Sequence, residues 1–140
     1  MIDNRTAPYA ALILRVALGV MFLVHSLYLK VFVFTVAGTV GFFESLGLPG
    51  LFAYLTILAE IGGGIALILG FQTRLVALAL IPVLLGATWV HSGNGWLFTA
   101  EGGGWEYPLF LTVAALVQAL LGSGAYAVKG PALLGQKVPA

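Results

Sequence analysis

Long apolar runs alternate with short polar segments along this chain. Four runs are long enough to cross a bilayer as helices, and they cover residues 9–34, 51–70, 74–91 and 106–128. About 20 apolar residues span the roughly 30 Å hydrocarbon core, and a helix satisfies its own backbone hydrogen bonds there. The pattern predicts an all-α integral membrane protein, a four-transmembrane-helix bundle forming one domain over residues 1–140.

The segments between the runs predict how the helices connect. Residues 35–50 mix small, aromatic and polar side chains, which favours a short interfacial helix between the first two spans, closed by a turn at 47–50. Residues 71–73 predict a tight hairpin, and the glycine-rich residues 92–105 predict a loop. Because these connections are short, successive helices are expected to be antiparallel.

Basic residues divide unevenly between the two ends of these spans. With the N-terminus inside, Lys30 lies toward the outer side, and the cytoplasmic side takes Arg5, Arg15, Arg74, Lys129 and Lys137. An excess of Lys and Arg marks the cytoplasmic side of a membrane protein. We therefore expect a multi-pass protein of the bacterial plasma membrane with both termini in the cytoplasm.

Composition supports this class and narrows the chemistry. The chain is 61% hydrophobic and 8% charged, which is far too few charges for a soluble domain, so the bilayer is its main partner. A net charge of +1 without clustered Lys and Arg predicts no nucleic-acid partner. The absence of cysteine excludes disulfides, thiolate metal sites and thiol redox chemistry within this chain.

His25 and Glu60 lie inside apolar runs, where an ionisable side chain is costly and marks a candidate functional site. Each is nine residues from the outer end of its span, so at 1.5 Å per residue both are about 13 Å deep. We therefore expect them at one level, as catalytic residues that bind a ligand or relay its protons. A buried carboxylate stays charged only beside a cation, for which His25, Lys30 and Arg74 are candidates. A purely structural tie between helices is the alternative.

Three further residues complete the candidate ligand-binding site. His91 and Glu106 lie where the third and fourth spans meet the outer surface, so we expect them at the mouth of a cavity. His91 could instead be a surface residue, and Glu106 a favourable charge at a helix N-terminus. Arg74 begins the third span and is either a ligand contact or an interfacial anchor.

The histidines and carboxylates predict no metal site, because their spacing contains no metal-binding motif. Haem is also disfavoured. Ligation by two histidines from different helices requires them at matching depth, whereas His25 is expected to be buried and His91 to lie near the surface.

Polar and glycine positions along the chain together resemble the DoxX family of small four-helix bacterial membrane proteins. The resemblance covers about residues 12–129, and it is carried in order by Arg15, Gly19, His25, Lys30, Gly47, Leu48, Pro49, Glu60, Gly63, Gly64, Leu69, Gly70, Thr73, Arg74, His91, Asn94, Gly95 and Glu106. The chain departs from the family pattern after His25, where the family commonly has glycine and a shorter step to the lysine.

This resemblance implies a membrane subunit of an oxidoreductase system, of which thiosulfate:quinone oxidoreductase is one example. The expected function is support of quinone-linked redox chemistry, with a quinone bound by His25, Glu60, His91, Glu106 and Arg74. Since the chain has no evident electron carrier, we expect a redox or membrane protein partner, or a homo-oligomer. The alternatives are a non-catalytic membrane scaffold within a larger complex and a small transporter or proton pathway.

Overall fold

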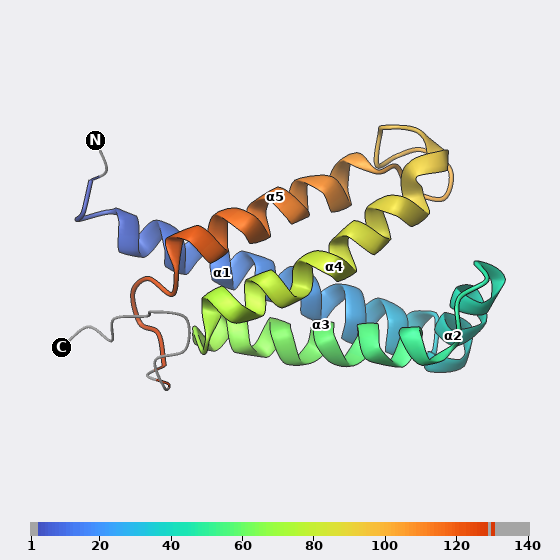
Figure 1. Ribbon diagram of the computed structural model, residues 1–140, viewed down its shortest axis with the longest axis horizontal. Coiled ribbons are helices and arrows are strands. Elements are labelled where there is room, and N and C mark those ends of the chain that lie inside the picture. The colour runs from blue at the N-terminus through green and yellow to red at the C-terminus, as the bar shows by residue number, and fades with distance from the viewer. Residues whose placement is uncertain (1–2, 129, 131–140) are drawn as a thin grey trace.

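The computed structural model describes residues 3–128 and 130, and this part of the chain is entirely helical apart from its turns and loops (Figure 1). In chain order the elements are α1 (Ala7–Leu23), the π-helix η1 (Val24–Val33), α2 (Val36–Ser45), α3 (Leu51–Leu69), α4 (Thr73–His91), the 3-10 turn η2 (Ser92–Asn94) and α5 (Glu106–Leu121). Lys129 and Lys137, which entered the prediction of orientation, lie outside the described residues.

Three continuous helical segments are long and apolar enough to cross a membrane. They are Ala7–Val33, Leu51–Leu69 and Thr73–Asn94. The described residues thus confirm the prediction of an all-helical chain with helices able to span a membrane. The fourth predicted span, 106–128, is helical only as far as Leu121, because Gly122 adopts a positive φ of 83° and turns the chain away. α5 is therefore a shorter apolar helix of 16 residues.

The helices pack mainly as two pairs, α1 with α3 and α4 with α5, and the two pairs diverge toward the end that carries α2 (Figure 1). Within the first pair the backbones cross closely at Gly19 and Gly64. A Cβ atom built on Gly19 would lie 2.6 Å from the Gly64 carbonyl oxygen, and one on Gly64 would lie 2.9 Å from the Gly19 carbonyl oxygen. Small residues at a crossing let two membrane helices make close backbone contact.

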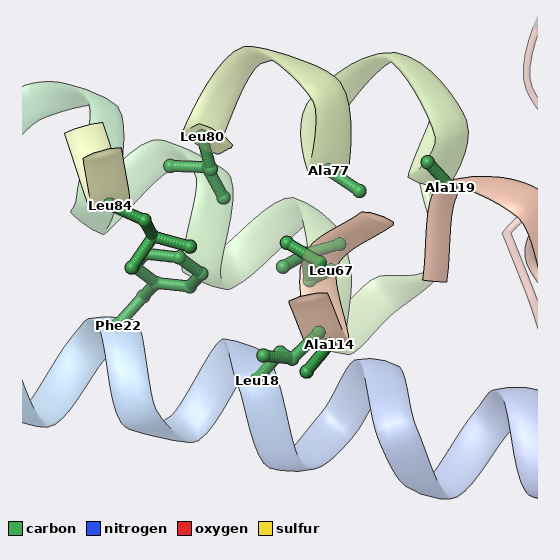
Figure 2. Packing of buried hydrophobic residues seen from close by; sticks show 9 residues of the cluster. Leu18, Phe22, Leu67, Ala77, Leu80, Leu84, Ala114 and Ala119 are labelled. Carbon is green, nitrogen blue, oxygen red and sulfur yellow. The ribbon is translucent and has the colours of Figure 1, made fainter. Parts of the chain in front are cut away.

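The main apolar core joins both pairs (Figure 2). Its buried members come from four helices and are Leu18, Phe22, Leu67, Ala77, Leu80, Leu84, Ala114, Ala115 and Ala119. Leu84 is the last buried residue of α4, and Phe22 is the last buried apolar residue of α1. Beyond this level, toward α2, the buried polar side chains Ser26 of η1 and Glu60 of α3 lie beside the buried apolar residues Ala53 and Ile57 of α3.

The first membrane-crossing helix changes its winding where those polar side chains begin. Val24–Val33 form a π-helix, in which backbone hydrogen bonds join residues five apart. His25 and Lys30 are therefore one turn apart along one side of η1, whereas an α-helix would separate them by about 140°. The longer step between these two residues is thus accommodated by the local winding of the helix.

Residues 122–128 close the opposite end of the bundle. The Ala125 amide donates a hydrogen bond to the Pro8 carbonyl at 2.9 Å, and the Val128 amide donates to the Leu69 carbonyl at 2.9 Å. This segment therefore rests against the start of α1 and the end of α3. The predicted hairpin between α3 and α4 is also present there, as a turn at Gly70–Gln72 in which Gly70 adopts a φ of 75°.

Candidate functional site

The centre of the candidate site is an ion pair between Lys30 of η1 and Glu60 of α3. The Lys30 Nζ and Glu60 Oε2 atoms are 2.5 Å apart, and the two side chains are 22% and 7% exposed. It is the one ion pair between residues 3 and 128. Both charges lie within segments able to cross a membrane, where a charged side chain needs a partner of opposite sign. Lys30 is thus the cation that Glu60 requires.

Two further hydrogen bonds fix η1 around this pair. The buried Ser26 hydroxyl donates to the Ile57 carbonyl oxygen at 3.2 Å, which ties η1 to α3 one turn from Glu60. The Thr39 hydroxyl of α2 donates to the Lys30 carbonyl oxygen at 3.0 Å. The Lys30 backbone is therefore held by α2 while its ammonium group is held by α3.

His25 lies one π-turn before Lys30 and contacts a different helix. Its Nδ1 atom is 2.9 Å from the Met21 carbonyl oxygen, and because a carbonyl only accepts, Nδ1 carries the proton. The imidazole stacks on the Tyr107 ring of α5, with 5.8 Å between centroids and 29° between planes. The Tyr107 hydroxyl donates to the Met21 sulfur at 3.5 Å. These contacts leave Nε2 as the imidazole nitrogen able to meet a ligand.

Within the described residues, no hydrogen bond or ion pair joins His25 directly to Glu60. The two residues expected to act together are related instead through Lys30, which follows His25 on η1 and contacts Glu60. Tyr107 was not predicted as a partner of His25, because an aromatic residue at the end of a membrane span is also typical of the membrane interface.

His91 and Glu106 both hold the loop of residues 92–105 onto the helix ends. His91 Nδ1 donates to the carbonyl oxygens of Gly102 and Gly103, at 3.0 and 3.1 Å. Glu106 Oε1 accepts a hydrogen bond from the Phe98 amide at 2.9 Å. Both residues therefore lie at the loop end of the α4–α5 pair, although neither contacts the Lys30–Glu60 pair.

A groove of about 430 Å³ opens beside this loop, between the loop and α5. The loop contributes Trp96 and Phe98, and the helix contributes Glu106, Tyr107, Leu109, Phe110 and Val113. Trp96 is fixed by an edge-to-face contact with Trp105, with 4.4 Å between ring centroids. Mostly apolar walls with a few polar groups at one end are typical of small-molecule sites.

Arg74 lies apart from all of these residues. It begins α4, roughly 26 Å along the helix from His91, and its Nη1 donates to the Ala119 carbonyl oxygen at 3.1 Å. A cation at that position satisfies the C-terminal end of α5. The structure therefore does not bring Arg74 together with the other predicted site residues.

The chemistry available at the site is proton exchange and hydrogen bonding. Residues 3–128 and 130 contain no group of three or more histidine and carboxylate side chains that could hold a metal ion. The Lys30 ammonium donates hydrogen bonds, the Glu60 carboxylate accepts them, and an imidazole such as that of His25 can do either through its two nitrogens. Three titratable side chains within one turn of η1 and the facing turn of α3 could thus serve a ligand that gains or loses protons.

Comparisons with known proteins place the chain among the members of one family. A family model described as DoxX matches residues 10–93. The chain is 36% identical over 84 residues to the "Putative oxidoreductase CatD" of Bacillus subtilis, a match that covers 60% of each chain. It is 33% identical over 98 residues to the "Inner membrane protein YqjF" of Escherichia coli, covering 66% of this chain and 70% of that protein. No solved structure matches the chain.

Proposed function

The chain belongs to the DoxX family of membrane proteins, and from this basis we propose that it is a plasma-membrane subunit supporting quinone-linked redox chemistry. The observation that carries the proposal is the Lys30–Glu60 pair, with His25 one turn away on η1. Intramembrane ionisable residues are expensive and typically mark ligand or proton pathways. The name of the Bacillus subtilis relative, "Putative oxidoreductase CatD", agrees with a redox role.

In the proposed reaction a quinone gains two electrons and two protons and becomes a quinol. In this proposal the electrons come from the redox centre of a partner protein, and this chain supplies the protons. The Lys30 ammonium group and the protonated His25 imidazole donate hydrogen bonds to the quinone oxygens. As negative charge develops on those oxygens, each of the two groups transfers one proton and is reprotonated from water, and Glu60 holds the lysine side chain in position.

The architecture proposed for this function has four spans, with α5 as the fourth, and both termini in the cytoplasm. α5 packs along α4, which is itself long enough to cross the bilayer. The Lys30–Glu60 pair, His91 and Glu106 then lie in the outer half of the membrane and at its outer surface. Arg15 and Arg74 lie toward the inner surface, where basic residues are favoured.

The test is substitution of Glu60 by glutamine, which keeps the size of the side chain but removes its charge. We expect binding of a short-tailed benzoquinone by the purified protein to fall at least about tenfold, because the lysine that meets the quinone loses its partner. Binding is measured by titration in detergent. Glu44→Gln, at an exposed position of α2, is the matched control and is expected to bind like the unmodified protein.

A folding defect is separated from a binding defect by a second variant. Glu60→Gln leaves the partly buried Lys30 without a counter-charge, whereas the double variant Lys30→Met, Glu60→Gln removes both charges and is expected to stay folded. If the double variant is as stable as the unmodified protein and still binds the quinone with unchanged affinity, the ion pair has no role in binding and the proposal fails.

A further inference from the structure

The groove beside α5 ends in a carboxylate, and this decides what it can bind. Glu106, Tyr107, Phe110 and Val113 follow one face of α5, at spacings of one, four and seven residues from Glu106. They extend roughly 10 Å along the helix, from its polar start into its apolar middle. A flat ring with a hydrocarbon tail fits this arrangement, with its polar end at Glu106 and its tail toward Val113. The groove lies outside residues 10–93, over which the family model matches.

Glu106 offers an acceptor in the wall of the groove, at the start of α5. Its Oε1 atom is occupied by the Phe98 amide, and its other carboxylate oxygen has no hydrogen-bond partner among the described residues. An ionised carboxylate accepts hydrogen bonds and cannot donate them. The head group of a ligand must therefore bring its own donor. A quinol hydroxyl does so, whereas the carbonyl oxygen of a quinone would face a second acceptor.

We infer that the α5 groove binds the reduced, quinol form of a membrane quinone, with one hydroxyl donating to Glu106. This inference rests on the proposed function and extends it, because it separates the two redox forms between two places. Lys30 donates and suits the carbonyl oxygens of the quinone; Glu106 accepts and suits the hydroxyls of the quinol. Tyr107 connects the two places, since its ring both lines the groove and stacks on His25.

The sequence of events balances in atoms and charge. At Lys30 and His25 a quinone receives two electrons from the partner protein and two protons, so that both of its oxygens become hydroxyls. The quinol then no longer needs donors and moves past Tyr107 into the groove, where a hydroxyl meets Glu106. Phe110 is 68% exposed at the groove, so the quinol leaves sideways into the bilayer.

The experiment measures binding of one benzoquinol with a ten-carbon tail and of its quinone form under anaerobic conditions. It uses the full chain carrying Lys30→Met and Glu60→Gln, which removes the other proposed site, and it follows quenching of tryptophan fluorescence, because Trp96 lines the groove. We expect the quinol to bind roughly tenfold more tightly than the quinone, as a hydrogen bond to a charged acceptor predicts.

Adding Glu106→Gln should bring the ratio of the two affinities to about one, because the amide both donates and accepts while still accepting the Phe98 hydrogen bond. Glu101→Gln, at an exposed loop position, is the control and should leave the ratio unchanged. Val113→Trp fills the apolar part of the groove and should weaken both forms, whereas Val117→Trp, one turn beyond the groove, should weaken neither.

Equal affinity for the two forms before Glu106 is changed would overturn the inference, and so would a quinol preference that survives Glu106→Gln. Displacement of the quinol by phosphatidylethanolamine, whose ammonium group also donates, would assign the groove to a lipid head group and overturn it as well. The test of the proposed function compares quinone affinity with and without the ion pair, whereas this experiment compares quinol with quinone in one variant, so failure of the groove assignment and failure of the proposed function are distinguishable.

Discussion

Arg15 is fully buried, and backbone carbonyls alone satisfy its guanidinium group. Its Nε donates to the Ser123 carbonyl oxygen at 2.8 Å and its Nη2 to those of Ala125 and Tyr126, at 2.8 and 3.1 Å. Nη1 donates to the last carbonyls of α3, those of Leu67 and Ile68. The fork of five donors in a guanidinium group suits this arrangement, and lysine would not replace it. Arg15 therefore ties α1, the end of α3 and residues 123–126 together.

Replacing Arg15 by methionine should destabilise the protein strongly. The apolar side chain fills similar space but leaves five carbonyl oxygens, most of them partly buried, without their donor, at a cost of about 3 kcal/mol. The thermal unfolding midpoint in detergent should fall by about 10 °C for a chain of this size. Arg5→Met, at an exposed position, is the control and should shift it little. An unchanged midpoint for Arg15→Met would show that these hydrogen bonds contribute nothing to stability.

Single residues of the site were predicted from the sequence better than their partners were. Glu60 was expected to need a cation, and Lys30 was among the candidates because the cost of a buried charge follows from position alone. The stacking of His25 on Tyr107 was not predictable, because the two residues are 82 positions apart in the sequence and meet only through the packing of their helices. Arg74 was grouped with the site for its polarity, but it lies at the opposite end of α4.

At the scale of elements, the contact of α1 with α3 depends on two glycines. Gly64 is the last of three consecutive glycines, and a side chain would have different surroundings at each of the three positions. A Cβ atom at Gly64 would lie 2.9 Å from the Gly19 carbonyl oxygen, whereas one at Gly62 meets no atom within 4 Å. The close crossing thus depends on the position within the run and not on the number of glycines.

Gly64→Ala should therefore separate the two helices and destabilise the protein by about 1–3 kcal/mol, because a backbone atom cannot move aside as a side chain can. Gly62→Ala should be neutral or stabilising by up to about 1 kcal/mol, since alanine favours the helix. Thermal unfolding of the two variants in the same detergent compares them directly. Equal destabilisation by both would mean that helix propensity, and not the crossing, determines the effect.

The elements themselves followed largely from the apolar pattern, with two exceptions. The π-helical winding of Val24–Val33 was not predicted, because apolar side chains surround that segment and hide the periodicity that distinguishes five-residue from four-residue hydrogen bonding. The end of α5 at Leu121 was also missed. Apolar residues continue beyond it, but the backbone conformation of Gly122 and the donors of Arg15 direct residues 122–128 elsewhere.

At the scale of the whole molecule, apolar and polar packing occupy different ends. The core joins α1, α3, α4 and α5 (Figure 2), and the two helix pairs diverge toward α2 (Figure 1). His25 and Lys30 follow Phe22, the last buried apolar residue of α1, and contact Tyr107 and Glu60. Stability and the proposed chemistry are thereby assigned to separate regions. Changes at the ion pair can then alter ligand binding without dismantling the core.

The proposed orientation can be tested because the chain has no cysteine of its own. Glu101→Cys, in the loop after α4, should react with a membrane-impermeant maleimide in intact cells. Asp3→Cys, before α1, should react only after the inner membrane is permeabilised, since basic residues favour a cytoplasmic N-terminus. Labelling of Asp3→Cys in intact cells would reverse the orientation, and with it the side from which Glu106 is reached.

The hydrogen bonds of Arg15 also constrain the order of events during synthesis. Its carbonyl partners on α3 follow 52 and 53 residues later and those in residues 123–126 follow 108 to 111 residues later, so α1 enters the bilayer before the oxygens that accept from its guanidinium group exist. Until then the arginine must stay near the head groups, where its long side chain can reach water. The first helix therefore settles at its final depth only when the last helix has been inserted, and a ribosome stalled before residue 123 would leave it raised in the membrane.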